Sequence, residues 1–298
     1  MIVYYNGEYL EEEEVHISPN DRGFMLADGV YEVVRSYKGL LFHMDRHMDR
    51  LRNSLAALRI STDLPDAIPQ ISRGLLSRNG LAESDALVYI QITRGAYPRT
   101  HIFPPADLKP THYVQLTGVH SSPEESARGV SAILVGDTRW SRCDIKSLAL
   151  LPNVLAAEEA NEKGVREALF VRDGMVIEGS RSNFAGIRSG RLITPPESNY
   201  MLPGISRGVV IELCERLGIP VEQRPVPERE LHSFDELILI GTSAEVLSIV
   251  SVDGKQIGDG RVGSVSRRLK AAFAEEVERL RLAEGAGMRT HRREEIAG

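Results

Sequence analysis

The sequence predicts a protein of the α+β class with antiparallel or mixed sheets. Segments with the two-residue period of strands are interspersed with segments that have the three- to four-residue period of helices. They do not follow the strict strand–helix–strand order of a parallel α/β protein. The length of 298 residues favours one large or two medium domains. A polar stretch rich in Ser, Pro and Gly near the middle of the chain supplies the boundary.

The N-terminal part is expected to contain two hairpins, two helices and two further strands. Asn6-Gly7, between two apolar runs, is a strong hairpin signal, and Lys38-Gly39 interrupts a second β-branched and aromatic run. Apolar residues recur at steps of three and four residues over 43–58, which predicts an amphipathic helix. The remaining expected elements are a helix over 66–78 and strands over 86–95 and 112–118.

The C-terminal part mixes strands and helices in another order. Asp173-Gly174 predicts the turn of a third hairpin, and glycines at 164 and 218 are stop signals for two helices. The expected elements are a strand (130–136), a helix (147–164), a hairpin (167–179), a helix (204–218), a strand–turn–strand unit (236–257) and a terminal helix (262–282).

The polar stretch and the C-terminal composition together define the expected domain organisation. The segment 119–129 is the best linker candidate, and the last residues are polar and without apolar periodicity. We expect an N-terminal domain (1–119), a linker (120–129), a C-terminal domain (130–284) and a disordered tail (285–298).

Composition excludes several function classes. The net charge of −6 argues against a nucleic-acid-binding surface, which is usually basic. No apolar run approaches the ~20 residues of a membrane span, and the N-terminus lacks the basic and apolar regions of a signal peptide. Two cysteines, Cys143 and Cys214, are interpreted as free buried thiols, which predicts a cytoplasmic protein.

The common catalytic fingerprints are absent from the sequence. It contains no G-x-G-x-x-G, P-loop, G-x-S-x-G or H-E-x-x-H motif. His43 and His47 in "HMDRHMDR" would share a helix face, but no third ligand of a suitable type is evident, so we expect no metal site. The acidic run at 11–14 is interpreted as solvated.

A single lysine in an apolar neighbourhood is the first candidate for chemistry. Lys146 lies in "RCDIKSLALLPN", next to the run Leu148–Leu151. Burial lowers the pKa of a lysine, and the neutral amine can attack a carbonyl to form a Schiff base. Pyridoxal phosphate (PLP) is the usual carbonyl for such a lysine. By itself, however, a lysine of this kind is more often structural.

Other segments could meet the further requirements of PLP, which are an acid beside the pyridine nitrogen and a phosphate site. Glu178 follows a strand in a turn rich in Gly and Ser, and Ser206 stands at a helix start. Thr242 lies at a strand end, and Arg50 on the first long helix offers a cation. Each also has an ordinary interpretation, as a turn residue, an N-cap or a surface residue.

Several longer motifs resolve this ambiguity. The segments "DRGFMLADGVYEVVR", "HMDRL", "RCDIKSL", "EGSRSN" and "LPGISR" occur in the order and spacing of one family. Through them the sequence resembles the fold-type IV PLP enzymes, which include branched-chain and D-amino acid aminotransferases and aminodeoxychorismate lyase. The resemblance covers nearly the whole chain. It implies a smaller N-terminal α/β domain and a larger C-terminal, barrel-like domain with a mixed sheet that binds PLP.

The resemblance also implies roles for individual residues. Lys146 would form the Schiff base, Glu178 would contact the pyridine nitrogen, and Arg50 would contact the phosphate. The rest of the phosphate site would consist of Ile205, Ser206 and Thr242. The family has Thr more often where Ser206 stands, and a serine hydroxyl serves equally well.

Within the family, the D-amino acid aminotransferases are the most similar subgroup. Arg99 and His101 form an Arg-x-His pair that, with Tyr31, would bind the substrate carboxylate. Lys146 would then act as general base and acid in transamination to a 2-oxo acid such as 2-oxoglutarate or pyruvate. The resemblance further implies a homodimer in which the Arg99 loop reaches the active site of the partner.

Two departures leave the substrate preference open. Pro203 is more common in the branched-chain group, and Arg181 lies between the two serines of "EGSRSN". The alternatives are therefore a branched-chain L-amino acid aminotransferase and an aminodeoxychorismate lyase. A third, from another class, is a binding protein that keeps the fold without turnover, against which the intact Lys146 and Glu178 weigh.

Overall fold

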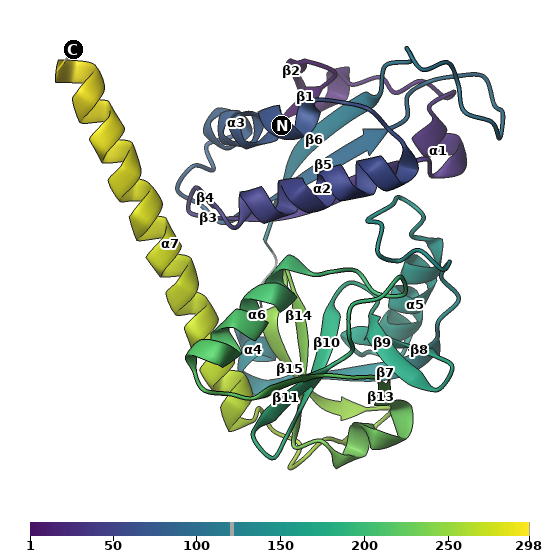
Figure 1. Cartoon of the computed structure of the whole chain (residues 1–298), viewed down its shortest axis with the longest axis vertical. Coiled ribbons are helices and arrows are strands. Elements are labelled where there is room, and N and C mark those ends of the chain that lie inside the picture. The colour runs from purple at the N-terminus through teal and green to yellow at the C-terminus, as the bar shows by residue number, and fades with distance from the viewer. Residues whose placement is uncertain (120–121, 298) are drawn as a thin grey trace. The chain divides into compact units, whose positions relative to one another are not determined.

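The computed structural model describes residues 1–119 and 122–297, with side chains described through 284. The chain divides into two compact units (Figure 1). Unit 1 comprises residues 1–52, 59–119 and 272–298, and unit 2 comprises 53–58 and 120–271. The units therefore differ from the expected domains 1–119 and 130–284, because residues 53–58 join unit 2 and the last residues join unit 1.

Unit 1 is built on a six-stranded antiparallel sheet with the order β2-β1-β6-β5-β3-β4. Its strands are β1 (Ile2–Tyr5), β2 (Glu8–Glu11), β3 (Gly29–Tyr37), β4 (Leu40–Leu41), β5 (Ala86–Thr93) and β6 (Thr111–Gly118). Both expected hairpins form, with two-residue turns that need positive φ. Asn6 and Gly7 have φ of 47° and 105°, and Lys38 and Gly39 have 48° and 92°.

Helices cover one face of this sheet (Figure 1). Alternate residues of the central strands, among them Val30, Val34 and Ile90, point to this face and are fully buried. The apolar stripe of α2 packs there through Met48 and Leu51. The helical elements before β5 are η1 (Glu12–Glu14), α1 (Arg22–Leu26), α2 (Met44–Leu58) and α3 (Leu64–Arg78).

Unit 2 contains a ten-stranded mixed sheet with the order β12-β11-β10-β14-β15-β7-β8-β9-β13, with β16 paired to β15. The pairs β7–β8, β7–β15 and β11–β12 are parallel and the other pairs are antiparallel. The strands are β7 (Val130–Gly136), β8 (Glu167–Arg172), β9 (Met175–Gly179), β10 (Asn183–Arg188), β11 (Arg191–Thr194), β12 (Val221–Gln223), β13 (Val226–Pro227), β14 (Glu236–Gly241), β15 (Glu245–Val252) and β16 (Lys255–Gln256).

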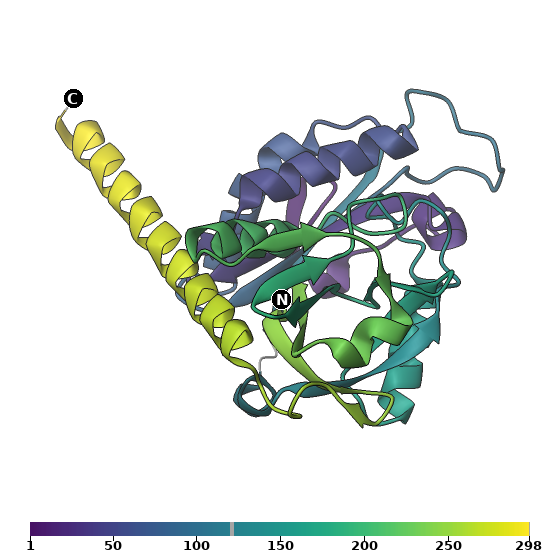
Figure 2. The ribbon, with the colours of Figure 1, turned by 60° about the horizontal axis from the view of Figure 1, so that its bottom comes forward.

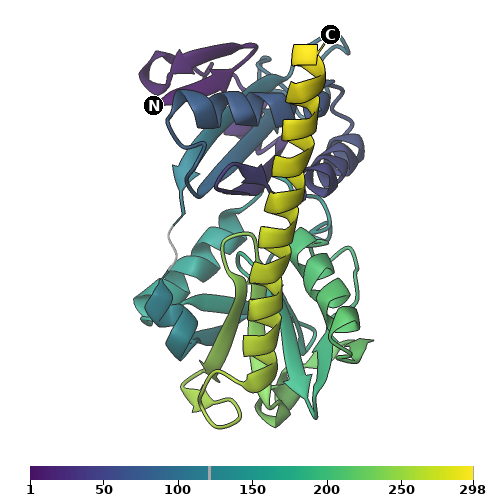
Figure 3. The same cartoon turned by 90° about the vertical axis from the view of Figure 1, so that its left-hand side faces the viewer.

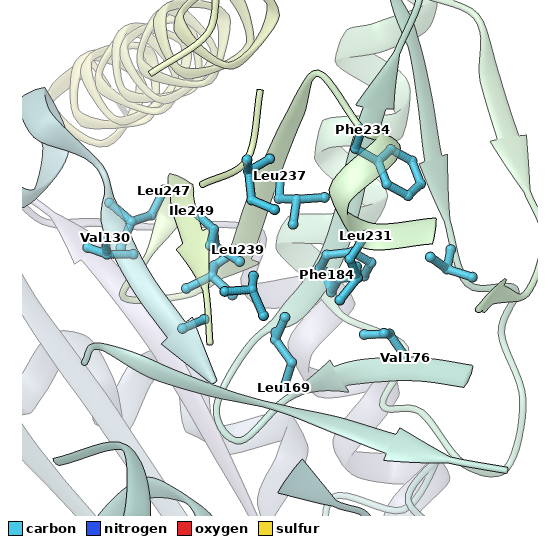
Figure 4. Close-up of a cluster of buried hydrophobic side chains, with 14 of the residues drawn as sticks. Val130, Leu169, Val176, Phe184, Leu231, Phe234, Leu237, Leu239, Leu247 and Ile249 are labelled. Atoms are coloured by element: carbon cyan, nitrogen blue, oxygen red, sulfur yellow. The ribbon is translucent and has the colours of Figure 1, made fainter. Parts of the chain in front are cut away.

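The sheet of unit 2 curls around an apolar core (Figure 4). Phe184, Leu169 and Leu239 are buried there, and Leu231 of η2 (Glu228–Ser233) packs among them. A second cluster lies where alanines of α5 (Leu151–Glu162) meet β7 and β8. Figure 2 shows the curled strands of unit 2 with α5 beside β8. The predicted α+β class with a mixed, barrel-like sheet is confirmed.

Some predicted elements differ from the observed ones. The helix expected over 147–164 is α5 and begins only at Leu151, with Pro152 in its first turn, because residues 146–150 are irregular. The expected linker contains a short helix, α4 (Pro123–Arg128), with Ser122 as N-cap, and its residues 120 and 121 lie outside the described part of the chain. Strands β10 to β13 and helix α1 were not predicted.

Two helices complete the fold. In α6 (Ile205–Arg216), the side chains of Val210 and Leu213 are buried. α7 (Ser264–Ala297) is continuous (Figure 3), and the buried Glu236 caps it by accepting from the amides of residues 265 and 266 at 2.9 and 2.8 Å. The disorder expected for 285–298 remains a prediction, since Gly298 and the side chains of 285–297 lie outside the described part.

Candidate active site

Three segments of unit 2 that are far apart in sequence meet at one edge of its sheet. Asn183 at the start of β10 lies opposite Ile240 near the end of β14 in antiparallel register. The turn 180–182 therefore lies beside the turn after β14, which contains Thr242. The loop before α6 reaches the same edge, since Asn183 donates to the carbonyl of Leu202 at 3.0 Å. Predicted cofactor-binding residues are thus brought together here.

Glu178, near the end of β9, is the buried acid of this edge. Its Oε1 accepts from Arg139 Nη1 at 2.5 Å, and its Oε2 accepts from Asn183 Nδ2 at 3.0 Å. The amide of Leu202 lies 3.3 Å from both carboxylate oxygens. These donors fix the carboxylate in one orientation.

Burial dominates the protonation of Glu178. Burial raises the pKa of Glu178, and the ion pair with Arg139, the amide of Leu202 and the charge of Lys146 lower it only in part, so that the resulting pKa is about 7. Two consequences follow. The Glu178 carboxyl can hold or release a proton near neutral pH, and Lys146 is near enough to interact with it electrostatically.

The pKa of Glu178 predicts how stability depends on pH. The pKa of this carboxyl rises from 4.5 in the unfolded protein to about 7 in the folded protein. Below pH 4.5 the group therefore makes its full contribution to the free energy of unfolding. That contribution is lost as the pH rises through about 7, and it amounts to about 3 kcal/mol. Urea unfolding of the cofactor-free protein between about pH 4 and pH 8 should show this loss against Glu178→Gln. A pH-independent difference between the two proteins would contradict it. Glu158→Gln, at an exposed position, is the control.

Arg139, Asp137 and Arg172 were not predicted as part of the site. Besides Glu178, the buried Arg139 guanidinium binds Asp137 through Nε at 2.9 Å and Nη2 at 3.0 Å, and it stacks on Phe170 at 4.3 Å. Arg172 also donates to Asp137, at 3.1 Å. Burial alone would raise the pKa of Asp137, but hydrogen bonds from both arginines outweigh it and lower that pKa. Glu178 therefore belongs to a chain of alternating charges.

A second buried acid, Glu167, shapes the turn after Glu178. It accepts from the amide and hydroxyl of Ser180 and from the hydroxyl of Ser182 at 2.9 Å. Asn153 of α5 donates to the carbonyl of Ser180 at 2.8 Å. The two serines of the "EGSRSN" motif thus hold the turn in place, while Arg181 between them is exposed. No periodicity or local motif in the sequence indicated Glu167.

The backbone amides at the start of α6 are not capped by a side chain. Gly204 is the N-cap and offers no side-chain cap, so the first-turn amides around Ile205 and Ser206 can serve an anion. A Cβ at Gly204 would overlap with Asn183 Oδ1. A side chain at position 204 would therefore require the Asn183 side chain to move.

Gly204→Ala is expected to destabilise the protein by about 1–3 kcal/mol, because Asn183 must move and lose its bond to Glu178. Cofactor affinity should fall with it, since both the first turn of α6 and Glu178 shift. Thermal unfolding and a cofactor titration measure the two effects. Gly136→Ala, where a Cβ meets nothing within 4 Å, is the matched control and should change neither. If both variants have the same melting temperature and cofactor affinity, a side chain at position 204 does not disturb Asn183.

Lys146 lies in the irregular segment before α5 rather than at a helix start. Its flanking residues Ile145 and Ser147 are buried while Lys146 itself is half-buried. Its amide donates to Ser54 Oγ, also in unit 2, at 3.2 Å. The apolar run that follows does not enter a core, because Leu151 is 68% exposed. The backbone is thus anchored on both sides of the lysine.

Arg50 lies in unit 1 within a buried charge cluster. Its Nε and Nη2 donate to the two oxygens of Glu32 at 2.7 and 2.9 Å, and His47 Nδ1 lies 2.8 Å from Glu32 Oε2. Burial acts to raise the pKa of Glu32, but Arg50 and His47 outweigh it and hold that pKa below its usual range. Glu32, which fixes the Arg50 guanidinium, was not predicted from the sequence.

The predicted carboxylate-binding residues also lie in unit 1. Tyr31 is on β3 opposite Gln91, and its ring centre is 5.9 Å from that of Tyr89. Arg99 and His101 are exposed on the loop between β5 and β6. Across the residues described, no group of three metal-binding side chains was found, and none of the described helices is apolar enough over a sufficient length to cross a membrane.

The residues of unit 2 fit PLP. A buried acid that titrates near neutral pH suits a pyridine nitrogen, and the uncapped amides at the start of α6 suit a phosphate group. A lysine is within electrostatic reach of that acid. These features match the requirements of a PLP site in an aminotransferase-type enzyme.

Comparison with known proteins agrees with this class. The family model of the class IV amino-transferases matches residues 29–252, and the chain belongs to that family. It is 38% identical over 277 residues to a D-alanine aminotransferase of Staphylococcus haemolyticus (93% of this chain, 98% of the relative). It is also 38% identical over 274 residues to the D-alanine aminotransferase of Bacillus licheniformis (92% and 96%).

Solved structures show the same fold. The branched-chain amino acid aminotransferase of Escherichia coli superposes with a TM-score of 0.85 at 26% identity, over 92% of this chain and 93% of that chain. A branched-chain enzyme of T.th., solved with pyridoxamine 5'-phosphate, gives a TM-score of 0.83 at 26% identity, over 92% and 93%. The predicted family is therefore confirmed.

Proposed function

We propose that this protein transfers the amino group of D-amino acids such as D-alanine to a 2-oxo acid such as 2-oxoglutarate or pyruvate, with PLP as its cofactor. The observation that carries the proposal is the buried Glu178 carboxylate, held by Arg139, Asn183 and the amide of Leu202, in a chain similar to D-alanine aminotransferases. The relatives match over 92–93% of this chain, which supports the substrate class.

The chain's own residues would divide the work as follows. Ile205, Ser206, Thr242 and Arg50 would bind the phosphate, and Glu178 would hold the proton at the pyridine nitrogen. PLP, when bound, supplies an electron sink for the electrons that remain on Cα after deprotonation. Lys146 would form the covalent link to the cofactor and, once displaced, take the Cα proton and return it as general acid.

Substrate orientation would come from Tyr31, Arg99 and His101. An arginine fork binds a carboxylate in a fixed plane, and His and Tyr add donors. The side on which the carboxylate is held decides which hydrogen of Cα faces Lys146. Arg99→Ala is therefore expected to raise the KM for D-amino acids far more than it lowers cofactor affinity.

One assay panel tests the proposal. Purified protein loaded with PLP is given D-alanine or L-leucine with 2-oxoglutarate, and formation of the oxo acid and of glutamate is followed. We expect turnover of D-alanine. Turnover of L-leucine without D-alanine would instead establish the second candidate, a branched-chain aminotransferase, in which a proline at the position of Pro203 is more common. Release of pyruvate without an amino acceptor would indicate a lyase.

We also propose a homodimer that acts in the cytoplasm. Both units carry exposed apolar side chains, Phe24 (78%) and Ile102 (76%) in unit 1 and Leu151 (68%) and Leu155 (63%) in unit 2. Cys143 and Cys214 are free and buried, which fits a reducing compartment.

Sedimentation should give twice the mass of 33.0 kDa. Mixing Lys146→Ala with Arg99→Ala protein should restore activity if the Arg99 loop serves the partner.

A further inference from the structure

The loop between β5 and β6 carries Arg99 and His101 without any helix or strand to support it. It covers residues 94–110, and Figure 2 shows it as a long excursion from the sheet. Long loops lose conformational entropy when they bind a ligand, so exposed binding residues need anchors. Near its start, the loop is held by backbone bonds from Arg22 to Gly95 and from Tyr97 to Asn20, both at 3.0 Å.

A buried arginine reaches the loop at the residue between the two predicted substrate-binding side chains. Arg22 is 3% exposed, and its Nη1 donates to the carbonyl of Thr100 at 2.8 Å. That carbonyl belongs to the peptide group that joins Thr100 to His101 and lies one residue after Arg99. One hydrogen bond from a buried cation therefore fixes the backbone from which both side chains project.

Arg22 is itself held in place by Asp28, which also binds a second buried arginine, Arg94. The Nε of Arg22 donates to Asp28 Oδ2 at 2.8 Å, and Arg94 donates to both oxygens of Asp28 at 2.8 and 3.0 Å. Arg94 also stacks on Phe103, further along the loop, at 3.9 Å. Asp28 therefore connects two arginine side chains, one that contacts the loop at Thr100, between Arg99 and His101, and one that contacts it at Phe103.

We propose that Arg22 is a positioning residue for substrate binding, because it sets the backbone that presents Arg99 and His101 to the substrate carboxylate. The proposal rests on the function proposed above and adds to it the residue that organises the carboxylate site. Arg22 touches neither cofactor nor substrate in this role. It acts through Thr100, and Asp28 and Arg94 hold its guanidinium.

Arg22→Lys tests the proposal, because a lysine keeps the charge opposite Asp28 but lacks the fork that bonds Asp28 and Thr100 at once. We expect the KM for D-alanine and for 2-oxoglutarate to rise about tenfold. The kcat at saturation, the absorbance of the bound cofactor and the melting temperature should change little, because ground-state carboxylate binding acts on KM. Arg78→Lys, at an exposed arginine that stacks on Tyr9, is the control. Arg22→Gln is the second variant should the lysine variant not fold.

A double-mutant cycle with Arg99→Ala separates positioning from a general structural role. If Arg22 acts through the loop, its change should have little further effect on KM once Arg99 is gone. An equal effect in both backgrounds, or an unchanged KM in Arg22→Lys, overturns the proposal and leaves the proposed function intact. If Arg99→Ala itself leaves KM unchanged, the carboxylate assignment falls and the role of Arg22 falls with it.

Discussion

Lys146→Ala is expected to lower the kcat for transamination of D-alanine by about 10⁴-fold. Both the covalent link to the cofactor and the transfer of the Cα proton depend on this amine, and loss of a positioned general base alone costs 10²–10⁴-fold, so about 10⁴ is the upper end of that range. Cofactor should still bind, since Glu178 and the first turn of α6 remain. Steady-state and single-turnover rates measure the loss.

Two observations would separate this result from misfolding. The absorbance band of the lysine-bound cofactor should disappear in Lys146→Ala while the melting temperature of the protein stays near that of the wild type. Lys163→Ala, at an exposed lysine that pairs with Glu159 at 2.8 Å, is the matched control and should keep full activity. Retention of a tenth of the wild-type kcat in Lys146→Ala would refute the catalytic role.

Arg139→Met is expected to lower the free energy of unfolding by about 3–5 kcal/mol. The substitution removes the cation between two buried acids, Asp137 and Glu178, while a methionine fills a similar volume over Phe170. Without Arg139, the pKa of Glu178 should rise further above about 7, so that the cofactor meets a protonated acid at neutral pH. Urea unfolding and cofactor titration at several pH values measure both effects.

The matched control for this change lies three residues along the chain. Arg142 also pairs with an acid, Asp144 at 2.9 Å, but its side chain is 47% exposed where that of Arg139 is 6% exposed. Exposed pairs contribute little, so Arg142→Met should cost less than about 1 kcal/mol. A cost for Arg139→Met no larger than for Arg142→Met would mean that the buried pair has no special role in holding Glu178.

The parts of the fold that depend on local chemistry were predictable from sequence. Turns such as Asn6-Gly7 and Asp173-Gly174 require positive φ, so they indicated their hairpins directly. Strands β10 and β11 are also joined by such a turn, Ser189-Gly190, with φ of 51° and 74°, and this hairpin was not predicted. β11 and β12 form a parallel pair, and α6 lies between them in the sequence. No local sequence signal could have indicated that pairing.

The residues of the candidate site also fall into two groups, those that local sequence patterns indicate and those that only the tertiary structure brings together. Lys146, Glu178 and Ser206 stand in motifs with a helix start, a turn or an apolar run, so sequence patterns could indicate them. Arg139 and Glu167 could not be found in this way. Glu178 lies 39 residues from Arg139 and Ser180 lies 13 residues from Glu167, so each pair meets only in the folded protein. Buried ion pairs of this kind are set by tertiary structure, and the same holds for Glu32 and Arg22.

The proposed roles are divided between the two units, except that Arg50, proposed to bind the phosphate, belongs to unit 1. Lys146, Glu178 and Ser206 belong to unit 2, whereas Tyr31, Arg99 and His101 belong to unit 1. Under the proposed function, substitutions in the β5–β6 loop would alter which amino acid is accepted without changing the residues of unit 2 that are proposed to hold the cofactor. Substrate preference and cofactor chemistry would then be open to separate change by substitution, one in each unit.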